Sequence, residues 1–164
     1  MKASLPAVIK HLHYQTDADC LIVVADSNHS PPHRGDDCIE KGLCRLCALR
    51  QLAEHTSQYL GVVRGRTQLQ VIVGVAVPAI EAWCIGDMIP DVSEHTWAAG
   101  FEKNEWPYNK NKLKDVVYGT DRPSLQLETE KGLTAARIAC QNLGRIEQRF
   151  PFGFGTMAAM LRRL

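Results

Sequence analysis

Hydrophobic residues concentrate in two short, nearly unbroken runs that predict buried β-strands. Residues 20–26 read Cys-Leu-Ile-Val-Val-Ala-Asp, and residues 69–77 read Leu-Gln-Val-Ile-Val-Gly-Val-Ala-Val. Runs rich in Val and Ile are typical of strands that are covered on both faces in a parallel sheet. The first run ends on Asp26, and ligands of open α/β sheets bind outside the carboxyl ends of the strands. Asp26 is therefore a candidate site residue, although an aspartate there also caps strands and starts turns.

Helical spacing of apolar residues accounts for most of the remaining chain. It predicts helices over residues 5–12, 43–60, 79–87, 91–97, 110–117, 124–143 and 153–164, with Pro78 at the start of the third and an Asp-Val-Ser-Glu capping box opening the fourth. We therefore predict a single α/β domain over residues 1–164. A mostly parallel sheet with flanking helices occupies residues 1–90, including a Cys/His loop at 29–47, and residues 91–164 form a helical part. Two strands are few for such a sheet, so either weak strands are missed or a partner chain completes it.

Composition narrows the class of protein without assigning a function. The 164 residues are 45% hydrophobic and 23% charged, as in an ordinary globular domain. A net charge of +1 gives no general attraction for nucleic acid, so contact with DNA or RNA would need a local patch. The first residues lack the apolar core of a signal peptide, and Gly74, Pro78 and Glu81 interrupt the longest apolar stretch, so we expect no membrane partner. Cysteines inside apolar patterns predict reduced thiols and a cytoplasmic location.

Two acidic side chains are candidates for a divalent-cation site. Asp26 ends the first strand and Glu81 lies in the first turn of the helix after the second, so neighbouring parallel strands would bring them to one end of the sheet. Carboxylate oxygens suit Mg²⁺ or Mn²⁺, and Asn28 or His29 could add a ligand. Asp87 projects from a different face of the predicted helix. The alternative is that Glu81 only stabilises the N-terminus of its helix through the helix dipole.

The loop after the first strand carries a pattern of soft metal ligands. Cys44 and Cys47 form a C-x-x-C pair, and Cys38 precedes it by six residues. Three thiolates and one histidine would complete a tetrahedral Zn²⁺ site, with His33 as the fourth ligand and His29 as its substitute. A structural zinc would also explain how so long a loop is ordered. The alternatives are reduced thiols at a helix start without metal, or a redox dithiol.

A third group combines cations with aromatic rings, as a single-stranded or kinked nucleic acid requires for phosphate attraction and base stacking. A lysine close to a metal site could also stabilise the charge that develops on a phosphate during cleavage. The alternative is a solvated helix face. No nucleophile elbow and no Walker-type glycine loop is present, which excludes serine hydrolases and nucleoside triphosphatases. The residues of this group are Arg64, Arg66, Lys103, Lys110, Lys112, Lys114, Trp106 and Tyr108.

Four stretches, in this order, resemble an uncharacterised bacterial family of Toprim-like proteins. Members are often encoded beside an ATPase and are similar to the nuclease half of overcoming-lysogenisation-defect proteins. The similarity covers nearly the whole chain, and its most distinctive part is the Pro-x-x-Glu-x-Trp element. The stretches are Leu-Ile-Val-Val-Ala-Asp-Ser-Asn at 21–28, Val-Pro-Ala-Ile-Glu-Ala-Trp at 77–83, Lys-x-x-Leu-Lys at 110–114 with Tyr-Gly at 118–119, and Phe-Pro at 150–151 with Phe154.

The resemblance implies a Toprim-like sheet, a divalent-metal site at the strand ends, and phosphodiester cleavage in defence against phage, with an ATPase as a possible partner. Asp26 matches the first acid of the family's Asp-x-Asp motif, and Asn28 stands where the second acid is expected. Glu81 matches the glutamate of the strand-to-helix element. Lys110 or Lys114 matches a lysine that would contact phosphate.

Two departures from the family pattern affect the expected activity. The neutral Asn28 binds a divalent cation less strongly than an aspartate would. A Toprim core also opens with a strand that bears an essential glutamate, and no such strand precedes residue 5. Either the sequence therefore starts late, or a partner chain completes a reduced domain. The sequence thus predicts a metal-dependent nuclease or a degenerate one. The alternative is a non-catalytic module that binds protein or nucleic acid through a zinc-stapled loop.

Overall fold

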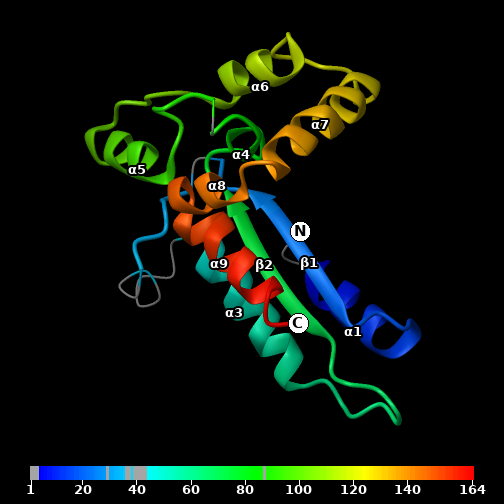
Figure 1. The fold of residues 1–164 in the computed structure, drawn as a ribbon. Coiled ribbons are helices and arrows are strands. Elements are labelled where there is room, and N and C mark those ends of the chain that lie inside the picture. Colours follow the sequence, from blue (N-terminus) through cyan, green and yellow to red (C-terminus); the bar gives the residue numbers. More distant parts are fainter. Residues whose placement is uncertain (1–3, 29, 36–37, 39–43, 87) are drawn as a thin grey trace.

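The two predicted strands pair side by side at the centre of the fold. The computed structural model describes residues 4–28, 30–35, 38, 44–86 and 88–164. Strand β1 (Cys20–Asp26) runs parallel to β2 (Gln70–Ala76), and the register sets Asp26 opposite Ala76. Both arrows point the same way in Figure 1. The strand predictions are confirmed, and the carboxyl ends of both strands lie at one end of the sheet.

Helices make up most of the rest of the described chain, in the order that the hydrophobic pattern predicts. A mixed α/β fold is therefore confirmed, whereas a Toprim-like fold stays a prediction. The helices are α1 (Leu5–Gln15), α3 (Arg45–Gln58), α4 (Glu81–Ile85), α5 (Glu94–Lys103), α6 (Lys110–Tyr118), α7 (Leu125–Cys140), α8 (Leu143–Arg149), the π-helical turn η1 (Pro151–Gly155) and α9 (Thr156–Leu161).

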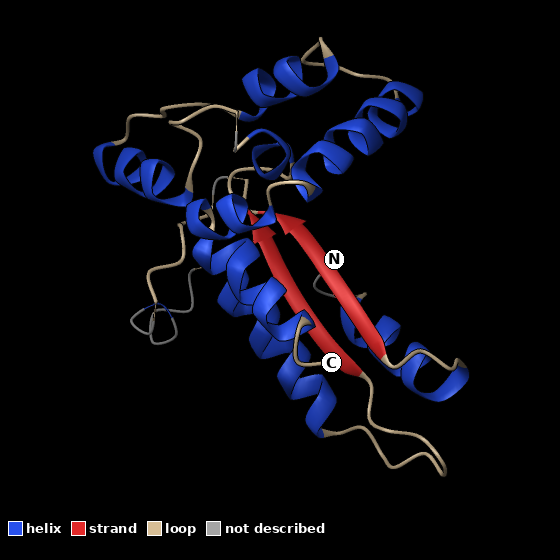
Figure 2. Cartoon of the chain, viewed as in Figure 1, coloured by secondary structure: helices blue, strands red, loops and turns tan. Residues whose placement is uncertain are grey.

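Apolar side chains on the two faces of the sheet belong to two separate core clusters. On one face, Val73 and Val75 of β2 pack with residues of α1 and α3, among them Ile9 and Leu49. On the other face, Ile72 packs with residues of α4, α8 and α9. Figure 2 shows α9 and α3 alongside β2. The alternation of side chains along β2 therefore divides its residues between two helical layers.

Three predicted helix starts differ from the observed ones. Helix α4 begins at Glu81, so Pro78 lies before the helix rather than in its first turn. Helix α5 begins at Glu94, and its N-cap is Ser93, which accepts a hydrogen bond from the Thr96 N–H, rather than the predicted Asp91. The predicted helix at 153–164 is preceded by the π-helical turn η1. At α5 the capping hydrogen bond of Ser93 determines where the helix starts.

The helix predicted over residues 124–143 is shorter, and its apolar side chains are more exposed, than the helical spacing indicates. The helix ends at Cys140, a new one begins at Leu143, and no residue of α7 is buried. Leu125 is 80% exposed and Leu133 is 57% exposed. Helix α7 packs mainly against the short helix α4 and against α6, and not against the sheet. Helical spacing of apolar residues identified the helix but did not determine how much of its apolar face is covered.

The sheet has two strands in the part of the chain that the structure describes. Ile22 of β1 is 50% exposed and Val24 is 38% exposed, because the helices that cover β2 on this face do not extend over β1. The edge of β1 that faces away from β2 pairs with no described strand. The shortage of strands seen in the sequence is real within the described residues, and completion by another chain stays a prediction.

None of the helices formed by the described residues has both the length and the apolar character needed to traverse a lipid bilayer.

The close packing of η1 on β2 requires glycine at residue 153. A Cβ on Gly153 would lie 2.1 Å from the Val75 carbonyl oxygen and 2.7 Å from Glu94 Oε1. Both neighbours are held in place, since one is backbone and the other accepts hydrogen bonds from η1. A side chain at this residue would therefore push the π-helical turn away from the sheet.

We expect Gly153→Ala to lower the free energy of unfolding by about 1–3 kcal/mol, the usual cost of overpacking. Urea unfolding measures the change. Gly144→Ala is the matched control, because no atom lies within 4 Å of its added Cβ and alanine favours a helix by up to about 1 kcal/mol. Equal effects of the two substitutions would contradict the observed packing.

Candidate functional site

Three cysteines and one histidine converge where the loop after β1 meets the start of α3. Cys44 is the N-cap of α3 and Cys47 lies in its first turn, while His33 and Cys38 come from the preceding loop. The ligand atoms of all four lie within 4.8 Å of one another. His33 Nδ1 is 3.7 Å from Cys44 Sγ and 3.3 Å from Cys47 Sγ. The three cysteines are buried and the histidine is half-buried.

These distances fit a tetrahedral metal site. With Zn–S near 2.3 Å and Zn–N near 2.0–2.1 Å, tetrahedral geometry places a ligating nitrogen about 3.6 Å from each sulfur. Burial raises the pKa of the Cys44 thiol, and burial together with the neighbouring thiols raises the pKa of Cys47 to about 12. A bound cation would reverse this, because it stabilises thiolates that otherwise repel one another. The cluster could therefore bind a metal such as zinc; His29, its predicted substitute ligand, lies outside the described residues.

Asp26 and Lys110 form an ion pair at the carboxyl end of the sheet. One carboxylate oxygen of Asp26 contacts Lys110 Nζ, and the other accepts a hydrogen bond from the Ile80 N–H at 2.9 Å. Lys110 comes from the first turn of α6, far along the chain. The parallel register brings Asp26 next to the turn before α4, where its carboxylate accepts the hydrogen bond from Ile80.

Glu81, the first residue of α4, lies in the same region but is almost completely buried. It is 4% exposed, and its Oε2 atom is buried without a hydrogen-bond partner. The pKa of Tyr118 is raised, chiefly by burial and then by the nearby charge of Glu81. A buried carboxylate oxygen without a partner is costly, and a cation is one of the groups that would satisfy it.

Lys114 lies near these acidic groups and forms an ion pair with Glu128, a residue that the sequence did not indicate. Its Nζ atom lies 2.8 Å from Glu128 Oε1 of α7, and this hydrogen bond is the largest cause of its raised pKa. The charges of Glu81 and Asp26 raise the pKa of Lys114 further. Asp26, Glu81, Lys110 and Lys114 therefore share one electrostatic neighbourhood. Glu128 reaches Lys114 because α6 packs against α7.

Asn28 lies at the same end of the sheet in a left-handed conformation. Its φ is 51°, and its N–H donates to the Pro78 carbonyl at 2.9 Å. This bond ties the end of β1 to the end of β2 through the main chain. The structure thus gives Asn28 a main-chain role, and its predicted role as a cation ligand stays a prediction. Asp87 lies outside the described residues.

The predicted nucleic-acid-binding residues are distributed over both ends of the molecule. Arg66 donates to the carbonyls of His13, Thr16 and Ala18, so it ties the loop before β2 to the segment after α1. Arg64 lies in the same loop, at the amino end of β2, whereas α5 and α6 lie at the other end in Figure 1.

The two aromatic members of this group contribute to the packing around α5. Tyr108 is 6% exposed, and its hydroxyl donates to the Ser93 carbonyl at 2.8 Å. Trp106 is 43% exposed and packs against Trp97 and Phe101. Lys112 lies in the exposed first turn of α6. A buried ring with a bonded hydroxyl is not available to stack on a base, so only part of the predicted set is accessible.

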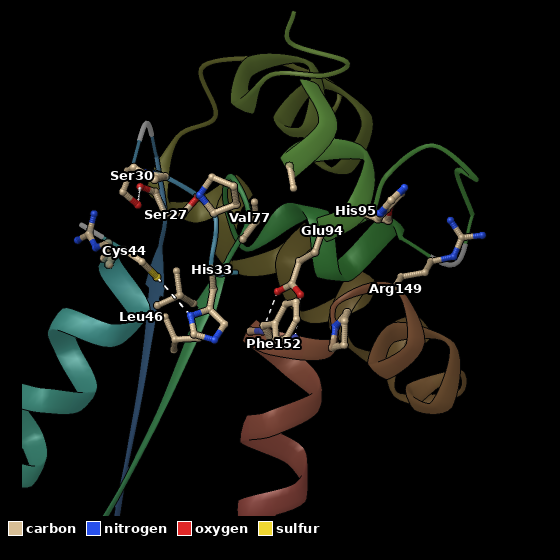
Figure 3. Close-up of a pocket in the computed structure, with 18 of the residues that line it drawn as sticks. Ser27, Ser30, His33, Cys44, Leu46, Val77, Glu94, His95, Arg149 and Phe152 are labelled. Carbon is tan, nitrogen blue, oxygen red and sulfur yellow. Dashed lines mark hydrogen bonds between the residues drawn. The ribbon is translucent and has the colours of Figure 1, made fainter. Parts of the chain in front are cut away.

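A cavity of about 480 Å³ adjoins the Cys/His cluster and was not predicted. His33, Cys44, Glu94, His95 and Phe152 are among the residues that line it, as Figure 3 shows. Neither Asp26 nor Glu81 is one of its lining residues. The sequence carried one signal for Glu94, namely its position in the predicted capping box, but that pattern indicates a helix start and not a cavity.

Glu94 is a buried carboxyl group bonded to the backbone of η1. It accepts hydrogen bonds from the N–H groups of Phe152 at 2.8 Å and Gly153 at 2.7 Å. Burial raises its pKa to about 7, although these two N–H donors and the charge of Arg50 act in the opposite direction. The protonated form of Glu94 is therefore favoured in the folded chain relative to the unfolded one.

Comparisons with models of protein families, with curated proteins and with solved structures give no match. The family predicted from the sequence motifs therefore stays a prediction, and the candidate sites rest on the chemistry and geometry of the chain itself.

Because the pKa of Glu94 is raised in the folded state, we expect its contribution to stability to fall as the pH rises from about 4.5 to about 7 and to level off above that range. A shift of this size corresponds to about 3 kcal/mol. Unfolding free energies of the parent and of Glu94→Gln, measured by denaturant titration between pH 5 and pH 8, give the difference that belongs to this group. A difference that does not change with pH would contradict the assignment.

Proposed function

We propose that the chain is a divalent-metal-dependent phosphodiesterase that cleaves nucleic acid, with its reaction centre at the carboxyl ends of β1 and β2. The supporting observation is that Asp26, Glu81, Lys110 and Lys114, which lie far apart in the sequence, share one electrostatic neighbourhood. Paired carboxylates with nearby lysines are the groups that phosphoryl transfer uses to hold a cation and to neutralise charge on the phosphate.

The donor set is compatible with Mg²⁺ or Mn²⁺ on one point of geometry: Glu81 Oε2 is buried and has no partner. Asp26 and Glu81 would hold the cation, which when bound polarises a phosphate and lowers the pKa of a water molecule. Lys110 would leave Asp26 and turn toward the phosphate, while the pair with Glu128 holds Lys114 in position beside the acidic groups. Both lysines would then offset the negative charge that develops during cleavage.

We expect Asp26→Asn and Glu81→Gln each to lower Mn²⁺-dependent cleavage of plasmid DNA or single-stranded RNA by at least about 100-fold, the scale for losing one electrostatic group of an active site. Gel assays of the purified chain with and without Mn²⁺ measure the rate. Asp121→Asn, an exposed acid in the loop between α6 and α7, is the control and should cleave normally.

The second candidate function is a non-catalytic binding module. One observation favours it: Asp26 already has partners on both oxygens, and Glu81 is almost completely buried, so neither acid is openly presented to a substrate. Absence of cleavage by the parent chain, or undiminished cleavage by folded Asp26→Asn and Glu81→Gln, would support the module and reject the phosphodiesterase.

The Cys/His cluster is proposed to hold one structural Zn²⁺ ion, which would join the loop after β1 to the start of α3. Four protein ligands complete the coordination, as in structural zinc sites, and leave no open position for chemistry. The ion would contribute to folding and would not take part in phosphodiester cleavage.

Elemental analysis of the purified chain should find about one zinc per molecule. Cys47→Ser should reduce the zinc content below about half an equivalent and lower the thermal unfolding midpoint, because the ligand set is then incomplete. Cys84→Ser is the control, since Cys84 lies outside the cluster and should leave the zinc content unchanged. Less than half an equivalent of zinc in the parent chain would reject the site.

A further inference from the structure

A groove of about 740 Å³ follows the edge of β2 that faces away from β1. Its floor is the edge of the sheet, and its walls come from α3 and α9, which lie on this side of β2 in Figure 1. The opening at the amino end of β2 is bordered by polar side chains. Its lining includes Arg50, Glu54, Ser57, Val71, Val73 and Thr156.

The main-chain groups of β2 alternate between β1 and this groove. The Gln70 N–H donates to the Asp19 carbonyl at 2.9 Å, and the Ala76 carbonyl accepts from the Ser27 N–H at 2.7 Å. Even-numbered residues of β2 therefore direct both their N–H and their C=O toward β1. Because the direction alternates along a strand, Val71 and Val73 direct theirs into the groove.

One end of this edge is already covered by the chain itself. The Val75 carbonyl faces η1, since a Cβ on Gly153 would lie 2.1 Å from its oxygen. Val71 and Val73 are therefore the residues at this edge that line the groove. Within the described residues, no hydrogen bond outside the sheet reaches the main chain of either valine, although Val73 is only 2% exposed. Main-chain groups this deeply buried are nearly always paired.

The walls of the groove carry charges that would select an occupant. Arg50 extends from α3 to α9, where its Nη2 donates to Thr156 Oγ1 at 2.5 Å, and its Nε is buried without a partner. Glu54 lies one helical turn further along α3, so about 6 Å separate the two positions along the helix axis. This nearly equals the advance of two residues along a strand, about 6.6–6.8 Å.

We propose that this groove binds an extended segment of a partner protein, which adds to β2 as a third strand. Its main chain would pair with Val71 and Val73, and it would carry an acidic residue facing Arg50 and a basic residue two positions away facing Glu54. An extended main chain presents donors and acceptors at the required two-residue spacing. A recess walled by two helices admits a single strand more readily than the edge of a second folded sheet. The proposal does not depend on the phosphodiesterase activity.

The test selects random ten-residue peptides displayed on phage against the full chain, with counter-selection on Val71→Pro. That proline removes an N–H that faces the groove and no bond to β1, so the sheet should persist. Enriched peptides should share an acidic and a basic residue separated by one position. Fluorescence polarisation measures the dissociation constants of these peptides. They should rise at least 10-fold with Val71→Pro and with Ser57→Trp, because the indole fills the groove. Gln51→Ala, at an exposed residue of α3, is the control and should leave them unchanged.

A proline scan of an enriched peptide distinguishes main-chain pairing from side-chain binding. Proline should weaken binding at alternate positions only, because every second N–H of an added strand faces β2. Amide hydrogen exchange at Val73 should be fast in the free chain and slow in the complex. The proposal is overturned if no peptide is enriched over the Val71→Pro chain, or if proline is tolerated throughout. It is also overturned if the free chain is a dimer in which the Val73 amide is already protected.

Discussion

The parallel pairing of β1 with β2 is the constraint on which the rest of the structure depends. Its register sets Asp26 opposite Ala76, so the segments after both strands emerge at the same end of the sheet. The Asn28 N–H and the Asp26 carboxylate then bond to the turn that leads into α4. A shift of one residue would reverse the faces of every side chain in the strand and separate these partners. The position of the first turn of α4 close to Asp26 is a consequence of this register.

Three acidic groups lie near this end of the sheet, and Glu81 and Glu94 are buried while Asp26 is half-buried. Their surroundings give them different properties. Glu94 receives two backbone N–H groups from η1, yet burial still raises its pKa to about 7. Glu81 keeps one oxygen without a partner, while Asp26 is compensated by Lys110. Desolvation disfavours a charged carboxylate unless a cation or several donors offset it. Glu94 therefore has a packing role, whereas a chemical role is proposed for Asp26 and Glu81.

The Cys/His cluster and the groove on β2 reflect the small size of the sheet in different ways. The two strands of the described residues offer little area for packing, and a metal held by His33 and three cysteines would add a further constraint at the start of α3. The same shortage of strands leaves an edge whose main-chain groups are recessed between α3 and α9. Both features follow from a sheet that has two strands among the described residues.

The sequence by itself determined the two strands and most of the helices, and it indicated the residues of the Cys/His cluster, because these depend on the local pattern and spacing of residues. It also indicated Asp26 and Glu81, since parallel strands with acids at their carboxyl ends bring those acids together. Only the tertiary structure decided the partners of these groups. The contact of Lys110 with Asp26, the approach of Glu128 to Lys114 and the burial of Tyr108 depend on how α5, α6 and α7 pack. Leu125 and Leu133 follow a helical pattern yet stay exposed, because a periodic pattern specifies a face of a helix but not the element that covers it.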